Sequence, residues 1–512
     1  MTISAGASRA DSATWIRSSG RAAFAAFAAT GRFLGRHIFL LLVLAGAVTL
    51  RVLMLRAYPY AFFFSDSRPY VQAAFDNVPN PIRPYGYSLL LKPFVPGPMD
   101  VVAVAQHLVG LGLVVAGYAF LVRRGTWRWL AALAVVPVAL DAREVTLEHY
   151  VLAETAFVAL TAGALFLLAW RQKVGVIAAA GAGLLLGFAA VTRSVGLPVI
   201  ALVALYLLVR RAGWWRFGAF LLPVVAIIGG YAVWYHHTHQ IYALGQYQGR
   251  FLYARVMTVA DCTKLDLTPP QRNLCMPNPP KEWKQRPDQY IWNPNSPANT
   301  LYKSTDYDPF LNEFAKTVIK QQPGDYLGMV LTETGWHLVP KAPLEPYNQC
   351  AMDRWLPPAM PGEMCNAPYY LDTFSPVAAP EPTIKVPNPR GEALRAYGSV
   401  ATTPGPLYAV GLLLALFAAV WRCRRQGWRD AADALLFVGT GFGLIVISVA
   451  TSIFDYRYSI PAILLIPVGI ALAVNRMRAV ARPNHVTVTP TESLTTVIPS
   501  PRKKTKATEH VT

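Results

Sequence analysis

Long, mostly apolar runs alternate with short arginine-rich stretches along most of this chain. About 20 apolar residues are enough for a helix to cross the roughly 30 Å hydrocarbon core of a bilayer. Ten runs approach that length, at 37–55, 101–122, 127–140, 150–170, 174–191, 195–208, 217–235, 404–421, 432–452 and 460–474. The pattern predicts an all-α polytopic membrane protein with ten transmembrane helices, of which those at 127–140 and 195–208 are short for a full crossing.

Composition supports this prediction, since 54% of the residues are hydrophobic and only 15% are charged. Such a chain is too apolar for an ordinary soluble domain and too strongly patterned for a disordered one. The formal net charge of +19 comes mostly from the arginine clusters between the apolar runs. It therefore indicates membrane topology and attraction to anionic lipid rather than nucleic-acid binding.

The arginine clusters predict the orientation, because Lys and Arg in short loops stay on the cytoplasmic side. With ten spans, the clusters at 1–36, 123–128, 171–173, 210–216, 422–429 and after 476 all fall on one side. We therefore expect a cytoplasmic basic arm at 1–36, followed by a seven-span module at 37–235 whose first loop, at 58–99, is external. A large extracytoplasmic segment at 236–403, three further spans at 404–475 and a disordered cytoplasmic tail at 476–512 would complete the chain. The Ala-rich, Arg-over-Lys composition favours a bacterial plasma membrane.

Four of the five cysteines lie in the external segment 236–403, which we expect to be a mixed domain or loop between spans seven and eight: Cys262, Cys275, Cys350 and Cys365. An even number of external cysteines fits disulfides formed in an oxidising compartment. The local pairs 262–275 and 350–365 are favoured, and free buried thiols are the alternative.

Apolar residues at helical spacing within 308–338 predict two amphipathic helices joined at Pro323. The Pro-rich remainder of the external segment is expected to be ordered by packing on the membrane helices rather than by a core of its own.

Ionisable residues near membrane depth are costly and indicate functional sites. Asp66 stands alone in FFFSDSRPYVQ (62–72), directly after the first span. Asp141, Glu144 and Glu148 follow one another at helical spacing, with His149 beside them, and Glu154 lies one turn into the fourth span. For Asp141 and Glu144 the structural alternative is a position at the N-terminal end of a helix, where the helix dipole favours negative charge.

Arg193 and Arg457 lie on the external side, against the trend that keeps basic residues inside. Such residues require an anion, which is a nearby carboxylate, Asp455 in the case of Arg457, or a ligand phosphate. Lys92 and Arg83 are further cations of the first loop. Within the second span, Gln106 and His107 are expected to form interhelical hydrogen bonds.

These motifs, in this order and on this side of the membrane, resemble the GT-C superfamily of polyprenyl-phosphate-dependent glycosyltransferases. The resemblance rests on Asp66 after the first span, RPYGY (83–87), EHYVLAE (148–154), TRSVGLP (192–198) and YRYSIP (456–461), together with the large external segment after span seven. It implies transfer of a hexose or pentose from a polyprenyl-phosphate donor to a cell-envelope glycan, lipid or protein acceptor on the extracytoplasmic face, with inversion. Mannosyl- and arabinosyltransferases are members of this type.

The resemblance implies roles for the residues singled out above. Asp66 would be the catalytic base, and the donor phosphate would be bound by Arg193, Arg457, Lys92 and Arg83. The acceptor, the sugar or a metal would be bound by Asp141, Glu148, His149 and Glu154.

The sequence departs from the family in one respect, because members often carry an acidic pair in the first loop. Here Asp66 is flanked by Ser65 and Ser67, and the next acid is Asp76. A divalent cation such as Mg²⁺ or Mn²⁺ would need further ligands from Asp141, Glu148 or the substrate phosphate. A polysaccharide ligase or polymerase that uses a lipid-linked glycan, or a lipid or glycan transporter, are the alternative functions.

Overall fold

The apolar runs of the sequence are helices in the computed structural model, which describes residues 8–276, 278–283, 285–345, 352–358, 389–421 and 431–481. The ten helices that match the ten runs are α1 (Ser8–Ala57), α4 (Asp100–Arg123), α5 (Arg128–Leu140), α7 (Glu154–Ala169), α8 (Val176–Thr192), α9 (Gly196–Val209), α10 (Trp214–His239), α19 (Pro406–Val420), α21 (Ala432–Thr451) and α22 (Ile460–Ala481).

Five of these helices are long and apolar enough to cross a membrane, judged by length and composition: α4, α10, α21, α22 with the turn before it, and α1 from Gly31 onward. The other five are apolar helices of 10–17 residues. For α5, α7, α8, α9 and α19, membrane crossing stays a prediction.

Helix α22 lies at the centre of the bundle and packs against α4, α5, α7, α19 and α21. From Ile460 to Val474 its residues are apolar on all sides, and Ile463, Leu464, Leu465 and Ile466 are almost completely buried. A helix without a polar face is stable only when other helices surround it. By contrast, α10 exposes most of its apolar surface, including Leu222 and Val225, which suits contact with lipid tails.

Helices α8 and α10 approach closely at the glycines of GAGLLLG. A Cβ atom at Gly183 would lie 2.0 Å from the carbonyl oxygen of Phe220, so no larger residue fits there without moving the helices apart. The spacing of Gly183 and Gly187 is that of the small-residue motif that packs membrane helices.

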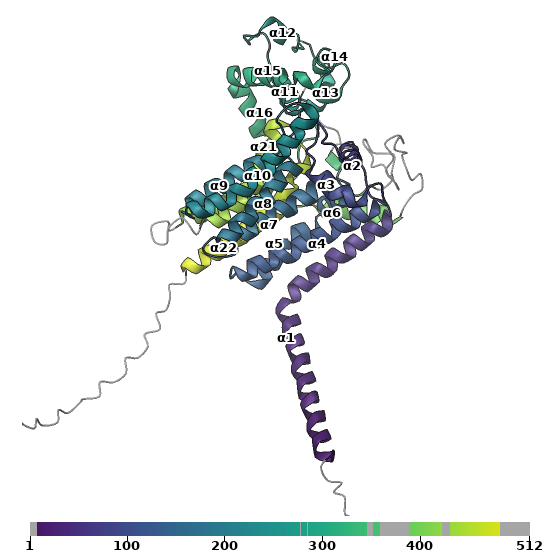
Figure 1. The fold of residues 1–512 in the computed structure, drawn as a ribbon, viewed down its shortest axis with the longest axis vertical. Helices are drawn as coiled ribbons and strands as arrows, with labels where there is room; N and C mark the ends of the chain where they lie inside the picture. Colours follow the sequence, from purple (N-terminus) through teal and green to yellow (C-terminus); the bar gives the residue numbers. More distant parts are fainter. Residues whose placement is uncertain are drawn as a thin grey trace, which may run out of the picture.

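Short helices between Gln248 and Trp336 form a cap at one end of the bundle (Figure 1). They are α11 (Gln248–Met257), α12 (Pro269–Arg272), η2 (Lys281–Trp283), α13 (Pro287–Trp292), α14 (Pro297–Thr300), η3 (Thr305–Tyr307), α15 (Asp308–Gln321) and α16 (Pro323–Trp336). Helices α15 and α16 meet at Pro323, which confirms the predicted pair of amphipathic helices.

The cap has a hydrophobic core of its own, formed among others by Tyr253, Leu274, Tyr290, Leu311 and Phe314. The expectation that the Pro-rich remainder is ordered by packing on the membrane helices was therefore wrong for the part around Leu274 and Tyr290, whereas Trp355 does pack into the core of the helix bundle. The apolar residues of the cap are spread over many short helices, so no long periodic run in the sequence indicates them. Cys262 and Cys275 form a disulfide within the cap, whereas Cys350 and Cys365 lie outside the described residues.

The first loop and the short helices that face it lie at the same end of the bundle as the cap (Figure 1). They are α2 (Ser67–Asp76), α3 (Gly86–Leu91), η1 (Lys92–Phe94), α6 (Ala142–His149), α18 (Pro389–Val400) and η5 (Tyr456–Ser459). The start of α1 and the end of α22 lie on the other side of the bundle, away from the cap (Figure 1). This arrangement gathers the polar loops that carry the candidate site residues.

Candidate active site

Asp66 is held in place by a backbone connection between two loops. The amide of Phe62 donates to the carbonyl of His149 at 2.9 Å, and the amide of Val151 donates to the carbonyl of Phe62 at 2.8 Å. Phe62 and Tyr150 thereby form an isolated parallel β-bridge. The loop that ends in Asp66 and the loop that ends in Glu154 consequently run side by side.

The carboxylate of Asp66 accepts hydrogen bonds from two arginines. Arg83 Nη2 lies 2.6 Å from Oδ1, and Arg457 Nη1 lies 2.9 Å from Oδ2. Asp66 stands at the N-cap of α2, but its side chain makes no capping hydrogen bond. The side chain of Asp66 is therefore engaged in the two ion pairs with Arg83 and Arg457 and does not cap α2.

Glu154 forms a second carboxylate centre beside Asp66. Its Oε1 is in direct contact with Arg193 Nη1 and lies 3.2 Å from Arg457 Nε. Arg457 thus lies between both acids. We refer to Asp66, Arg83, Glu154, Arg193 and Arg457 as the arginine–carboxylate cluster.

Several polar atoms of this cluster have no hydrogen-bond partner within the described part of the chain. They are the buried Nε of Arg83, the buried Oε2 of Glu154 and the buried Nε of Arg457, whose ion pair with Glu154 Oε1 at 3.2 Å lacks hydrogen-bond geometry. Buried polar atoms are almost always paired, so unpaired atoms in a native site indicate a missing ligand or water. The cluster therefore offers such a ligand one donor that no carboxylate engages, Arg83 Nε, and one acceptor, Glu154 Oε2.

The electrostatic balance of the cluster is positive, because three guanidinium groups face two carboxylates. Burial opposes ionisation of Asp66, but Arg83 and Arg457 outweigh it and hold the pKa of Asp66 below its usual range. Arg83, Asp66 and Arg193 keep 14–20% of their side-chain surface exposed, whereas Glu154 and Arg457 keep 4% and 6%. A ligand therefore reaches the cluster from the side of Asp66, Arg83 and Arg193.

Aromatic side chains surround Arg457. Its guanidinium carbon lies 5.3 Å from the ring centre of Trp355, 5.4 Å from that of Tyr458 and 5.9 Å from that of Phe64. Stacking of this kind favours Arg over Lys. The phenol of Tyr70 is also buried near the cluster, and burial raises its pKa.

The remaining predicted phosphate and acid ligands lie elsewhere. Lys92 Nζ donates to Asn77 Oδ1 at 2.7 Å on the exposed surface. Asp141 is the N-cap of α6, where it accepts from the amides of Arg143 and Glu144 and also binds the amide of Thr403. For Asp141 the structural alternative is thus observed, and a role in substrate binding stays a prediction.

Glu148 and His149 belong to a separate buried network. Glu148 forms an ion pair with Arg51 and contacts His107, and His149 contacts His107. Of the four residues predicted to bind acceptor, sugar or metal, the structure brings only Glu154 into direct contact with the cluster.

A divalent cation does not fit the cluster as it stands. No group of three or more His, Cys, Asp and Glu side chains suited to a metal ion is found among the residues that the structure describes. Asp66 and Glu154 are both neutralised by guanidinium groups, which would repel a cation at the same oxygens.

Sequence reasoning missed two features of the site. Arg457 was expected to pair with Asp455 or with a phosphate, but Asp455 accepts instead from the backbone amide of Arg457 and from the indole of Trp355. Trp355 lies in a Pro-rich segment about 100 residues before Arg457, and nothing in the local pattern indicates that they meet.

Comparison with solved structures finds distant matches along most of the chain. ArnT from Cupriavidus metallidurans in the apo state is 13% identical, with a TM-score of 0.34, over 88% of this chain and 78% of ArnT. Its structure bound to undecaprenyl phosphate is 14% identical, with a TM-score of 0.31, over 86% and 78%. AglB from Archaeoglobus fulgidus, in complex with an inhibitory peptide and a dolichol-phosphate, is 11% identical, with a TM-score of 0.36, over 87% of this chain and 52% of AglB.

At these TM-scores the similarity assigns neither family membership nor activity to this chain. No protein-family model matches the sequence, and no curated protein is significantly similar to it.

Proposed function

We propose that this protein is a membrane glycosyltransferase that transfers one sugar from a polyprenyl-phosphate donor to a cell-envelope glycan, lipid or protein acceptor. The observation that carries the proposal is the meeting of Arg83, Arg193 and Arg457, from three separate segments, around Asp66 and Glu154. The charge pattern of the loops supports a site that faces the extracytoplasmic side, and the Ala-rich, Arg-over-Lys composition supports a bacterial plasma membrane.

The phosphate of the donor suits the charge of this cluster. A polyprenyl-phosphate sugar is a phosphodiester with one negative charge, and the cluster has one guanidinium more than it has carboxylates. The Nε of Arg83, which has no hydrogen-bond partner among the described residues, supplies a charge-assisted donor for a phosphate oxygen. As the sugar leaves, the phosphate gains a second negative charge, so the same arginines bind the departing group more strongly than the substrate.

Asp66 supplies the base in this proposal. Its lowered pKa makes it a weak base while both arginines bind it. A phosphate that draws the guanidinium groups away would raise the basicity of Asp66 at the moment of reaction. The acceptor hydroxyl then attacks the anomeric carbon, its proton moves to Asp66, and the bond between that carbon and the phosphate oxygen breaks with inversion. Glu154 Oε2 is placed to accept a hydrogen bond from a sugar or acceptor hydroxyl.

The position of the cluster also suits a lipid-linked donor. Glu154 is the first residue of α7, and Arg457 lies three residues before α22 begins. A phosphate bound between them would leave its polyprenyl chain free to remain in the bilayer alongside the apolar helices.

Turnover of defined donors tests the proposal. The purified protein in detergent is incubated with a panel of polyprenyl-phosphate sugars and envelope acceptors, and released polyprenyl phosphate is followed by mass spectrometry. Wild type is compared with Asp66→Asn and with Asp76→Asn, which alters an exposed acid of the same loop that contacts Gln72. We expect release by wild type and Asp76→Asn, and a loss of at least ~100-fold for Asp66→Asn.

Other outcomes separate the alternatives. Full activity of Asp66→Asn would move the base to the segment between Asp141 and Glu154. Turnover only of a long glycan on a diphosphate would identify a polysaccharide ligase. Consumption of no donor by the wild type would contradict the transferase proposal.

A further inference from the structure

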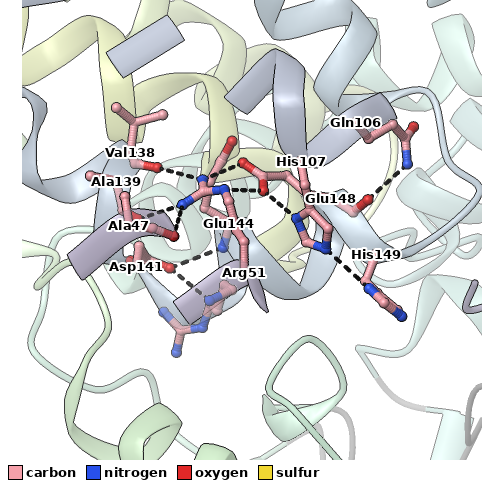
Figure 2. Close-up of polar contacts among 11 residues, drawn as sticks. Ala47, Arg51, Gln106, His107, Val138, Ala139, Asp141, Glu144, Glu148 and His149 are labelled. Atoms are coloured by element: carbon pink, nitrogen blue, oxygen red, sulfur yellow. Dashed lines mark hydrogen bonds and ion pairs between the residues drawn. The ribbon is translucent and has the colours of Figure 1, made fainter. Parts of the chain in front are cut away.

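Beside the arginine–carboxylate cluster, a network of hydrogen-bonded charged and polar side chains runs through the interior of the bundle (Figure 2). Arg51 of α1 forms two contacts with Glu148 of α6, from Nε to Oε2 at 2.8 Å and from Nη2 to Oε1 at 2.6 Å. His107 Nδ1 of α4 lies 2.7 Å from Glu148 Oε2, and His107 Nε2 lies 3.1 Å from Nδ1 of His149. All four side chains are at most 2% exposed. The function proposed above assigns no role to this network.

One turn of α4 leaves room for this side-chain network and binds it. A Cβ atom at position 110 would lie 1.8 Å from Glu148 Oε1, so only glycine leaves room for the carboxylate. Gln106 Nε2 donates to the carbonyls of Glu148 and Tyr150, at 2.9 and 2.7 Å. Gln106, His107 and Gly110 therefore all serve to hold the C-terminal end of α6.

The hydrogen bonds determine how many protons the two histidines carry. His149 Nε2 lies 3.0 Å from the carbonyl oxygens of Tyr58 and Tyr60, and only an N–H can bind two carbonyls. His107 Nδ1 faces an oxygen of Glu148 that also accepts from Arg51, so this nitrogen must be a donor as well. The contact between the two rings requires one further proton. The pair therefore holds three protons, one more than two neutral imidazoles.

The extra positive charge belongs on His107. Burial and the nearby His107 lower the pKa of His149 to about 3, which keeps His149 neutral. His107 directly contacts the Glu148 carboxylate, which compensates an imidazolium. The other titratable groups close to this network are Tyr58 after α1, Asp141 at the N-cap of α6 and Glu144 on α6; burial, together with Glu148 and Asp141, raises the pKa of Glu144.

The last side chain of this network, His149, contacts the backbone that holds the proposed site. His149 binds the carbonyls of Tyr58 and Tyr60, and its own carbonyl binds the amide of Phe62, four residues before Asp66. Gln106 binds Tyr150, four residues before Glu154. The same buried side-chain network thus contacts both loops, the one that carries Asp66 and the one that carries Glu154.

We propose that His107 is a buried imidazolium and that Arg51, Glu148, His107 and His149 form a positioning network that fixes the loops of Asp66 and Glu154 relative to each other. These residues are positioning residues and do not touch the substrate. Their effect on turnover rests on the proposed function, whereas the proton count and the loop order do not.

Nitrogen NMR of ring-labelled histidine tests the proton count. The chain has nine histidines, so the signals of the pair are assigned by their loss in His107→Gln and His149→Gln. At neutral pH we expect three protonated ring nitrogens in the pair, and two in Glu148→Gln, which removes the carboxylate. His239→Gln, which removes a surface contact to Pro79, leaves the pair unchanged. Only two protonated nitrogens in the wild type would overturn the proposal, whether or not the variants fold.

Hydrogen exchange tests the positioning role without an activity assay. In His107→Gln we expect amide protection of 58–66 and 149–154 to fall at least ~10-fold, while the cap helix α15 keeps its protection. Unchanged protection of both loops, or an equal loss throughout the bundle, would contradict positioning.

Turnover gives a second readout once a donor is identified. His107→Gln is expected to lower kcat ~10-fold or more per folded molecule, with the KM for the donor within about twofold of wild type. An unchanged kcat would overturn the positioning role. A wild type that consumes no donor contradicts the proposed function instead, and the NMR and exchange results then decide this inference alone.

Discussion

Arg457 Nη1 donates to Asp66 Oδ2 at 2.9 Å, although the two residues lie 391 positions apart in the sequence. The same guanidinium lies 3.2 Å from Glu154, so one side chain joins the first loop, the start of α7 and the turn before α22. A planar guanidinium presents donors on several edges at once, which the single ammonium of Lys does not. Arg457 is therefore the residue that makes one site out of three segments.

Removal of the negative charge of Glu154 is expected to strengthen phosphate binding. In Glu154→Gln, Arg193 and Arg457 lose a competing carboxylate and the net charge of the cluster rises by one. We expect the inhibition constant of polyprenyl phosphate to fall ~10-fold, about 1.4 kcal/mol, and turnover to slow as product release becomes limiting. Product-inhibition kinetics measure both, with Glu345→Gln as an exposed control. Weaker inhibition would show that Glu154 does not compete with phosphate.

His337 is expected to make stability sensitive to acid. It is 2% exposed and contacts Phe454 in a tilted arrangement, with 4.5 Å between ring centres. Burial and the nearby Arg143 lower its pKa to about 3. Between that value and the ordinary histidine pKa near 6.5 the unfolded chain binds more protons, so stability falls as pH falls through this range.

The variant His337→Phe isolates this contribution. From pH 7 to 5, wild type is expected to lose about 2 kcal/mol more stability than the variant. Thermal unfolding at the two pH values measures the difference, with the exposed His237→Gln as a control. If wild type and His337→Phe lose equal stability, His337 does not titrate as described.

Removal of divalent cations is expected to leave activity within about twofold of untreated enzyme, because the guanidinium groups already neutralise Asp66 and Glu154. Turnover is measured after treatment with EDTA and again after addition of Mg²⁺ or Mn²⁺. A loss with EDTA that either cation restores would mean that the bound phosphate supplies the missing ligands of a metal.

The disulfide between Cys262 and Cys275 is expected to stabilise the cap. It closes a loop with a sequence separation of 13 residues, for which chain entropy gives about 3 kcal/mol. In Cys262→Ser/Cys275→Ser, limited proteolysis should cleave within 248–336 faster than in wild type, whereas Cys423→Ser should behave as wild type. Equal cleavage of all three proteins would show that the cap core suffices without the bond.

The sequence predicts the ten apolar helices well, because burial in lipid or in a helix bundle leaves long apolar runs. Helix α7 and the other four short apolar helices coincide with predicted runs even where length alone does not establish a membrane crossing. The cap core was missed because Tyr253, Leu274 and Phe314 come from separate short helices without a common period.

The site could be predicted only in part. Asp66, Arg83, Arg193, Arg457 and Glu154 each stood out because a charge at the membrane boundary is costly, and the structure brings all five together. Their partners were not predictable from local sequence. Glu148 carries the same signal as Glu154, but it binds Arg51 and His107, because it lies on α6 whereas Glu154 begins α7, and the packing of each helix decides which partner its acid reaches.

Binding of polyprenyl phosphate to the wild type and to Arg457→Gln tests whether the arginine–carboxylate cluster is the phosphate site. The two proteins are placed in lipid nanodiscs and titrated with undecaprenyl phosphate at several salt concentrations, with Arg395→Gln, which removes a pair to Asp353, as a control. We expect Arg457→Gln to raise the dissociation constant for undecaprenyl phosphate at least ~10-fold and to weaken its dependence on salt, because one guanidinium that binds the phosphate is lost. The control is expected to bind as the wild type does. Equal affinity of wild type and Arg457→Gln would contradict a phosphate site at the arginine–carboxylate cluster.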